Sequence, residues 1–146
     1  MNVEILEADL TRPDHPMGNA SPLPGDVMER LIPGLQTHPT TVILLAWSGG
    51  DVVGIATCFR GFSTFYARPV LNIHDLAVLP QFRGRGVGRQ LIEAVARKAR
   101  QLGCFKVTLE VHEENVRAKA MYEAAGFAEG MAREPGHRWL FYSKML

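Results

Sequence analysis

The sequence lacks the features that mark several classes of protein. Two cysteines, Cys58 and Cys104, are too few for the disulfide framework of a small secreted domain. Five scattered histidines without any Cys-x-x-Cys pair give no metal-ligand spacing, so we expect no metal. No apolar run approaches the roughly 20 residues that span a bilayer; the longest is Val42–Trp47. The N-terminus has no basic flank or signal-peptide core. We therefore expect a cytoplasmic protein with reduced thiols and no membrane partner.

The sequence also lacks an excess of positive or negative charge. Sixteen Lys and Arg against fifteen Asp and Glu leave a formal net charge of +1, which gives no global case for a nucleic-acid partner. The 47% hydrophobic and 21% charged residues are ordinary for a globular protein. There is no internal repeat or low-complexity tract, and 146 residues suffice for one domain with a core, so we expect residues 1–146 to form a single domain.

Hydrophobic periodicity predicts a chain that mixes strands and helices. Strands are predicted at Val3–Leu10, Thr41–Trp47, Val52–Phe59, Val70–Val78, Phe105–Val111, Phe127–Met131 and Trp139–Met145. Helices are predicted from an Asp26 cap to a stop at Pro33-Gly34, over 87–102, and from Asn115 to Gly126. The helix at 87–102 has one apolar face and ends at Gly103; the face comprises Val87, Leu91, Val95, Ala99 and Leu102. Ser48-Gly49-Gly50-Asp51 is typical of a hairpin turn, and 60–69 is predicted to be a connection rich in aromatic residues.

The strand Val70–Val78 changes phase along its length. Leu71 and Ile73 are apolar at odd positions, whereas Leu76 and Val78 are apolar at even positions. One extra residue near His74-Asp75 would reconcile the two halves, as a β-bulge does. A strand buried on both faces would explain the same pattern without a bulge.

A glycine- and arginine-rich segment, Arg83-Gly84-Arg85-Gly86-Val87-Gly88-Arg89, separates this strand from the helix at 87–102. Glycine admits positive φ and a close ligand, and the unpaired N–H groups of a first helical turn attract anions. Arginine adds charged, forked donors. The segment therefore indicates a phosphate site.

Other interpretations of this segment fit less well. A Walker-type loop needs Lys and then Ser or Thr after its last glycine, but Arg89-Gln90 follows Gly88. A dinucleotide fingerprint starting at Gly84 would need glycine where Arg89 stands, although Glu110 falls near the position of a ribose-binding acid. A tight turn with solvated arginines is the purely structural alternative.

Two segments together resemble a known family. Arg83-x-x-Gly86-x-Gly88, preceded by a strand that ends in Asp75-Leu76-Ala77-Val78-Leu79-Pro80, is similar to the acetyl-CoA pyrophosphate motif of the GNAT-type N-acetyltransferase superfamily. The segment from Asn115 to Phe127, Asn-Val-Arg-Ala-Lys-Ala-Met-Tyr-Glu-Ala-Ala-Gly-Phe, resembles its Asn-to-Tyr helix. The resemblance covers roughly residues 40–146 in the order of elements.

The resemblance implies an α/β (α+β) single-domain fold. Its sheet would be mixed and mostly antiparallel, with a central parallel, splayed strand pair flanked by helices. It also implies acetyl-CoA as cosubstrate, with the pyrophosphate on the amides of 83–89. The pantetheine arm would lie along the bulged strand and pair with free backbone groups of Leu76, Ala77 and Val78. The implied CoA-binding residues are Leu76, Ala77, Val78, Arg83, Gly84, Arg85, Gly86, Val87, Gly88, Arg89, Asn115, Lys119 and Tyr122.

The implied reaction is direct attack of a primary amine on the thioester. By resemblance, Tyr122 protonates the departing thiolate, and the N–H near Leu76 polarises the thioester carbonyl. The structural alternatives are a core aromatic for Tyr122 and a plain helix cap for Asn115. The candidates for the base are His74, Asp75, Glu110 and His112, with Asp75 preferred because it flanks the bulge; solvent-relayed deprotonation is the alternative.

The acceptor is less well specified by the sequence. Residues 11–40 contain six prolines and only one short helix pattern, where the superfamily usually has two helices. We expect a small-molecule amine, with a protein or peptide amine as the alternative acceptor and a catalytically inactive CoA-binding module as the alternative function. Edge strands and the apolar segment Trp139–Tyr142 indicate a homodimer.

Overall fold

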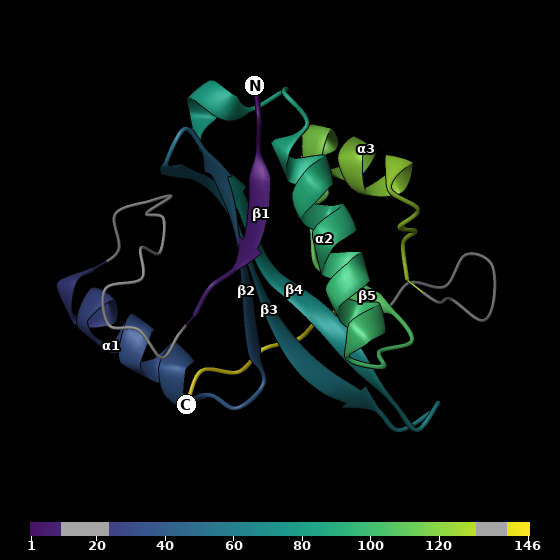
Figure 1. Ribbon diagram of the computed structural model, residues 1–146. Helices are drawn as coiled ribbons and strands as arrows, with labels where there is room; N and C mark the ends of the chain where they lie inside the picture. Colours follow the sequence, from purple (N-terminus) through teal and green to yellow (C-terminus); the bar gives the residue numbers. More distant parts are fainter. Residues whose placement is uncertain (10–23, 131–139) are drawn as a thin grey trace. The chain divides into compact units, whose positions relative to one another are not determined.

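The computed structural model describes residues 1–9, 24–130 and 140–146 (Figure 1). Within these residues, five strands form one sheet in chain order: β1 (Glu4–Glu7), β2 (Thr41–Ser48), β3 (Asp51–Ser63), β4 (Arg68–Val78) and β5 (Val107–Leu109). β1 to β4 pair antiparallel, and β5 pairs parallel to β4. The expected fold class, a mixed and mostly antiparallel α/β sheet with one parallel pair, is confirmed. The sheet belongs to residues 1–111, and residues 112–146 form a second unit.

The helix between the parallel strands, α2 (Val87–Gln101), follows its sequence pattern closely. Val87, Leu91, Val95 and Ala99 are all buried, so the face predicted from their spacing is the face that packs. Gly103, with φ of 74°, lies just beyond the C-terminus of the helix, as predicted. The predicted strand–helix–strand unit is therefore confirmed.

A second helix within residues 1–111, α1 (Gly25–Thr37), differs from its prediction at both ends. Pro24 is the N-cap, and Asp26 instead lies in the first turn, where its carboxylate pairs with Arg30 at 3.0 Å. Pro33 does not stop the helix, although its ring removes one N–H donor and crowds the carbonyl one turn earlier, because the later amides still bond. Leu35 is buried beyond it, and His38 N donates to Gly34 O. Burial of Leu35 thus outweighs the local stop signal.

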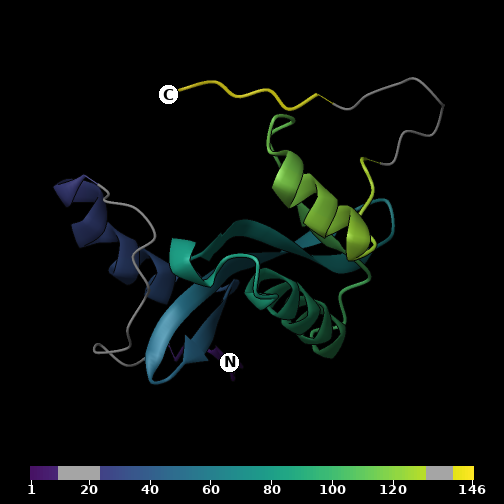
Figure 2. The same ribbon diagram turned by 90° about the horizontal axis from the view of Figure 1, so that it is seen from above.

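The two helices cover opposite faces of the sheet (Figure 2). Strand residues alternate in direction, so one face carries the side chains that meet α2 and the other carries those that meet α1. Gly54 of β3 lies under α2, and a Cβ there would approach Leu91 Cδ1 to 3.1 Å and Val87 Cγ1 to 3.2 Å. On the other face, Leu35 of α1 packs in a cluster of residues from the first three strands. This cluster comprises Ala8, Leu35, Ile43 and Leu45, with Trp47, Val52, Ile55 and Phe59 against it.

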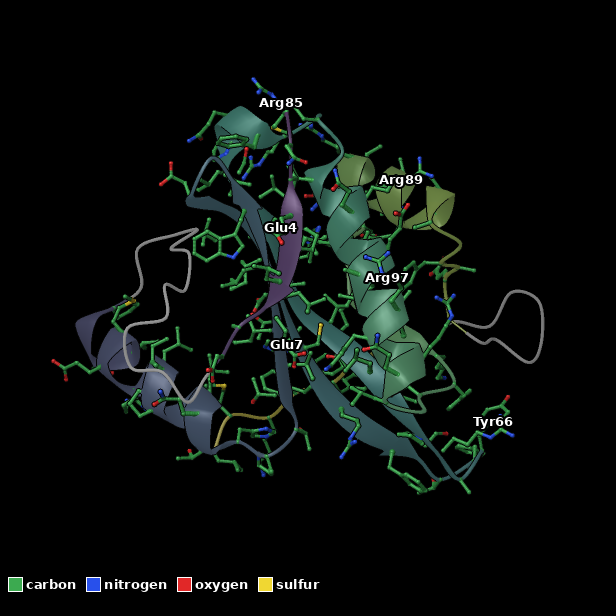
Figure 3. All side chains as sticks on the ribbon, viewed as in Figure 1. Glu4, Glu7, Tyr66, Arg85, Arg89 and Arg97 are labelled. Atoms are coloured by element: carbon green, nitrogen blue, oxygen red, sulfur yellow. The ribbon has the colours of Figure 1, made fainter. Side chains whose placement is uncertain are left out.

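The hairpin between β3 and β4 is longer than predicted. The expected connection at 60–69 is too long: 64–67 form the turn, whereas Arg60 pairs with Leu71 and the pairing continues to Ser63 and Arg68. The aromatic residues of the segment lie at the tip, where Phe62, Phe65 and Tyr66 are exposed. Figure 3 shows Tyr66 at this end, and its ring lies 4.7 Å from that of Phe105. The sequence did not predict this pairing, because residues 60–69 have no alternating pattern of apolar side chains.

Strands are also shorter or missing toward the C-terminus. β5 covers only Val107–Leu109 of the predicted 105–111, although Phe105 N still donates to Pro69 O. The pairing ends at Leu109 because its partner Ile73 is followed directly by the bulge of β4. The predicted strands at 127–131 and 139–145 are wrong for 127–130 and 140–145, which form no strand; Met131 and Trp139 lie outside the described residues. Alternating side chains favour a strand locally, but a strand needs a paired edge. None of the described helices is long and apolar enough to cross a membrane.

Replacement of Gly54 tests the close approach of α2 to β3. We expect Gly54→Ala to lower the free energy of unfolding by about 1–3 kcal/mol, because the new methyl overlaps Leu91, Val87 and the Ala77 carbonyl. Gly34→Ala is the control: its Cβ meets nothing within 4 Å, so we expect a gain of about 0.5–1 kcal/mol from helix propensity. Urea unfolding measures both, and equal stability of the two variants would contradict the packing.

Candidate functional site

The chain turns sharply between β4 and α2. A short 3₁₀ turn, η1 (Pro80–Phe82), follows Leu79, and Phe82 N donates to Leu79 O. Gly84 and Gly86 then take φ of 73° and 84°, a left-handed region that side chains with a Cβ enter at a cost of about 1–2 kcal/mol. Gly86 is the N-cap of α2. The two glycines therefore let the chain reverse and enter the helix within a few residues.

The N-terminus of α2 is open for an anion. The first intrahelical bond runs from Gln90 N to Gly86 O, and the amides of Val87, Gly88 and Arg89 have no acceptor among the described residues. No side chain caps this end, and a Cβ built on Gly86 would meet nothing within 4 Å. Unpaired amides, the positive end of the helix dipole and free space make this a site that fits a phosphate or pyrophosphate.

The three arginines of the turn are engaged in different ways rather than free. Arg83 Nε donates to Val78 O at 3.0 Å. The guanidinium of Arg85 lies 5.7 Å from the centroid of the Phe82 ring, a cation–π contact. Arg89 Nε donates to Glu93 Oε1 at 3.0 Å, a pairing one helical turn apart. Figure 3 shows Arg85 at the turn and Arg89 at the start of α2. An exposed ion pair such as Arg89–Glu93 is worth about 0–1 kcal/mol, so a phosphate can compete for Arg89.

The predicted β-bulge is present in β4. Asp75 pairs with Thr57 and Ile73 pairs with Cys58, so His74 is an extra residue without a partner across the ladder. The extra residue explains the phase change, because Ile73 and Leu76 both lie opposite residues of β3 that face α2. The alternative of a strand buried on both faces is thereby excluded, since His74 and Asp75 are exposed.

Beyond the bulge, one edge of β4 pairs with no strand of the described residues. Leu79 N donates to Val53 O at 2.9 Å, which makes this a hydrogen-bonded pair. Bonded and non-bonded pairs alternate in an antiparallel ladder, so the backbone groups of Leu76 and Val78 turn away from β3. They face the side where β5 ends at Leu109, and no described strand pairs with them there. The predicted splay between β4 and β5 thus begins at the bulge.

One expectation about this edge needs correction. Ala77 was expected to offer free backbone groups together with Leu76 and Val78. The same alternation pairs Ala77 with Ile55 of β3 in the bonded register, so its N–H and C=O face β3. The phase of the ladder, which depends on the partner strand, decides this point and cannot be read from β4 alone.

Two titratable side chains of the bulge lie near the face that α1 covers. Asp75 is exposed opposite Thr57, which is 8% exposed. The His74 ring lies 5.7 Å from that of Phe59, which also meets His38 at 5.0 Å. Sequence reasoning missed Phe59 and His38, because only the fold brings α1, β3 and β4 together here. It also missed Glu93, which its i+4 spacing from Arg89 would have indicated.

The second unit contains α3 (Val116–Ala124) and three of the predicted site residues, Asn115, Lys119 and Tyr122. Asn115 is the N-cap, and its Oδ1 accepts from Ala118 N at 3.2 Å. Gly126, with φ of 93°, follows the helix, as the pattern predicts. The Tyr122 ring is tilted toward Phe127, and burial raises the pKa of the Tyr122 phenol above its usual value. This phenol therefore keeps its proton at neutral pH, as an acid requires.

Two other kinds of chemistry concern the metal-ligating and thiol side chains of the described residues. They contain no group of three or more His, Cys, Asp or Glu side chains that could hold a metal ion. Both cysteines are free thiols, and burial raises the pKa of Cys58 to about 12. Cys58 therefore remains a neutral, unreactive thiol in the core.

Comparison with known proteins supports the resemblance. Residues 8–127 match the model of the acetyltransferase (GNAT) family. The chain belongs to this family. GNAT relatives include the uncharacterized N-acetyltransferase YhfO of Bacillus subtilis, 32% identical over 95 residues, or 65% of this chain and 63% of that protein. A thialysine N-epsilon-acetyltransferase of Bos taurus is 33% identical over 93 residues, or 64% of this chain and 54% of that protein. The chain thus matches less than two thirds of the length of either relative.

Solved structures agree on the GNAT fold. The aminoglycoside N-acetyltransferase AAC(6')-Iy, in a complex with CoA, aligns with a TM-score of 0.73 and 24% identity. The alignment covers 99% of this chain and 96% of that chain.

Replacement of Gly86 tests the open N-terminus of α2. We expect Gly86→Val to weaken CoA binding at least about tenfold, because its side chain fills the space in front of the free amides. Gly103→Val is the matched control: it has φ of 74° and open space, hence similar backbone strain, at the other end of the same helix. Isothermal titration calorimetry gives both affinities. CoA binding that falls equally in the two variants would point to strain rather than to the anion site.

Proposed function

We propose that this GNAT protein transfers acetyl from acetyl-CoA to a primary amine by direct nucleophilic attack, with residues 1–146 acting as one acetyltransferase domain. The observation that carries the proposal is the combination of an uncapped helix N-terminus with an unpaired strand edge beside it. The first supplies donors for a pyrophosphate, and the second supplies a row of amide groups for an arm that itself contains amides. Few ligands other than CoA contain both a pyrophosphate and an arm with amide groups.

In this proposal the edge of β4 also activates the thioester. The N–H of Leu76 faces the open side, directly after the bulge, where it has no strand partner among the described residues. Such a fixed donor stabilises an oxyanion that develops on a thioester carbonyl in the splay. Val78 offers the next groups along the same edge and orients the pantetheine arm. Acetyl-CoA supplies the activated acyl group when bound.

The acceptor amine is proposed to approach from the face that α1 covers. The opposite face of the bulged strand is closed, because Leu71, Ile73 and the α2 residues Leu91 and Val95 are buried there. Asp75 is the carboxylate that we assign to hold the ammonium group and take its proton. Its exposed position leaves it accessible to a cation. His74, beside it, is the alternative proton acceptor, held by its contact with Phe59.

By the family resemblance, Tyr122 is assigned as the acid that protonates the CoA thiolate, and Asn115 and Lys119 of the same segment are assigned as CoA-binding residues. Burial favours the neutral phenol, so its proton is available at the pH where an amine is reactive. A module that only binds CoA would not need such an acid, so Tyr122 favours an enzyme.

The acceptor is proposed to be a small-molecule amine rather than a protein. Relatives and structural neighbours include proteins named for thialysine and for aminoglycosides, which are both small compounds with primary amines. A neighbour named for a ribosomal protein keeps a protein amine as the second candidate. The two free thiols are consistent with a cytoplasmic protein, and the exposed residues Leu140, Phe141 and Tyr142 are consistent with a homodimer.

A panel of amines tests the proposed reaction. We expect release of free thiol from acetyl-CoA with at least one small amine, such as thialysine or an aminoglycoside, well above the rate without acceptor. Mass spectrometry of the acceptor checks that one acetyl group is added. CoA binding without turnover on any small amine or peptide would support the inactive module instead.

Removal of the Tyr122 hydroxyl tests the acid. We expect Tyr122→Phe to lower kcat by roughly 10²–10⁴-fold and to leave CoA binding nearly unchanged. Because the pKa of Tyr122 is raised, the wild-type kcat should fall only above about pH 10, and this alkaline decline should vanish in the variant. Steady-state rates across pH check both. Equal rates for the two proteins would leave Tyr122 a packing residue.

A further inference from the structure

We propose that Arg83 occupies the position of the pantetheine arm on β4 when no ligand is bound, and that it must release Val78 before the arm can pair there. The inference rests on the proposed function, because it concerns the same strand edge. It gives Arg83 a positioning role that differs from that of the other two arginines of the turn.

The first observation concerns the backbone of Val78 and its contact with Arg83. The backbone of Val78 turns away from β3, as the alternation from the Leu79–Val53 bond requires. Its carbonyl oxygen therefore lies on the open edge of β4. Arg83 Nε donates to this oxygen at 3.0 Å. A side-chain N–H thus stands where the amide N–H of an added strand would stand.

The second observation is that Arg83 lies between η1 and the N-terminus of α2. Arg83 follows η1 directly, and its own N–H donates to Pro80 O, so its backbone belongs to the turn that leads into α2. The side chain is exposed and has no ion-pair partner among the described residues. A guanidinium released from Val78 is therefore free to carry its charge toward an anion at the N-terminus of α2, a few residues along the chain.

The other arginines provide a contrast within the same turn. Arg85 contacts Phe82, and Arg89 pairs with Glu93 on the outer side of α2. Neither donates to the edge of β4. Only Arg83 connects the two halves of the proposed site, so only its removal should affect the two halves of CoA in opposite directions.

The binding of separate CoA fragments tests whether removal of Arg83 has opposite effects on pantetheine and on pyrophosphate. We expect Arg83→Met to bind pantetheine roughly 3- to 10-fold more tightly, because the Val78 carbonyl is no longer occupied, and to bind inorganic pyrophosphate more weakly. Arg89→Met is the matched control: it should weaken pyrophosphate binding and leave pantetheine binding unchanged. NMR titration of the full chain measures both ligands. Pantetheine affinity that is unchanged or lower in Arg83→Met overturns the proposal.

A second measurement uses the wild-type protein and does not depend on a variant. We expect the Nε–H of Arg83 to exchange with water more slowly than that of Arg85 without ligand, and to lose this protection when pantetheine is added. Fast exchange at Arg83 without ligand, or protection that pantetheine leaves intact, overturns the proposal. Failure of the wild-type protein to bind CoA at all would instead overturn the proposed function. The two failures are therefore distinguishable.

Discussion

One extra residue in β4 is the constraint on which the rest of the site depends. His74 has no partner across the ladder, so the strand bends there and the parallel pairing with β5 ends at Ile73. The bulge also resets the phase of the strand, which keeps Leu76 and Val78 packed toward α2 while their backbone groups face an open edge. A regular strand could not meet both requirements with this sequence. Burial and an accessible backbone thus coexist on the same few residues.

In the turn between β4 and α2, glycines set the backbone conformation and arginines supply positive charge. Gly84 and Gly86 provide left-handed backbone, which brings the uncapped N-terminus of α2 close to the end of β4. The arginines add charge, but each is held by a different neighbour: a carbonyl, an aromatic ring and a carboxylate. The ion pair of Arg89 with Glu93 is exposed and weak, so an anion can compete for this guanidinium. The fixed donors are therefore the backbone amides, and the arginine side chains are adjustable.

Sequence reasoning succeeded where one segment determines its own conformation. The face of α2, the glycines that flank it, the phase change in β4 and the helix ended by Gly126 were all predicted from local patterns. It failed where distant segments decide. The hairpin at 60–69 forms by cross-strand pairing, α1 continues through Pro33 because Leu35 is buried, and apolar alternation at 140–145 did not produce a strand. The roles of Asp75, Lys119 and Tyr122 stay predictions.

The sequence by itself determined the change of hydrophobic phase in Val70–Val78, the glycines that permit a positive φ at positions 84 and 86, and the apolar stripe of α2. Each of these follows from steric limits or periodicity within a dozen residues. Only the tertiary structure decided that Ala77 turns its backbone inward, that Arg83 reaches Val78, and that Phe59 lies between His38 and His74. These relations depend on which strand pairs with which, and in which phase. Pairing energy is shared between segments far apart in the chain, so no single segment contains it.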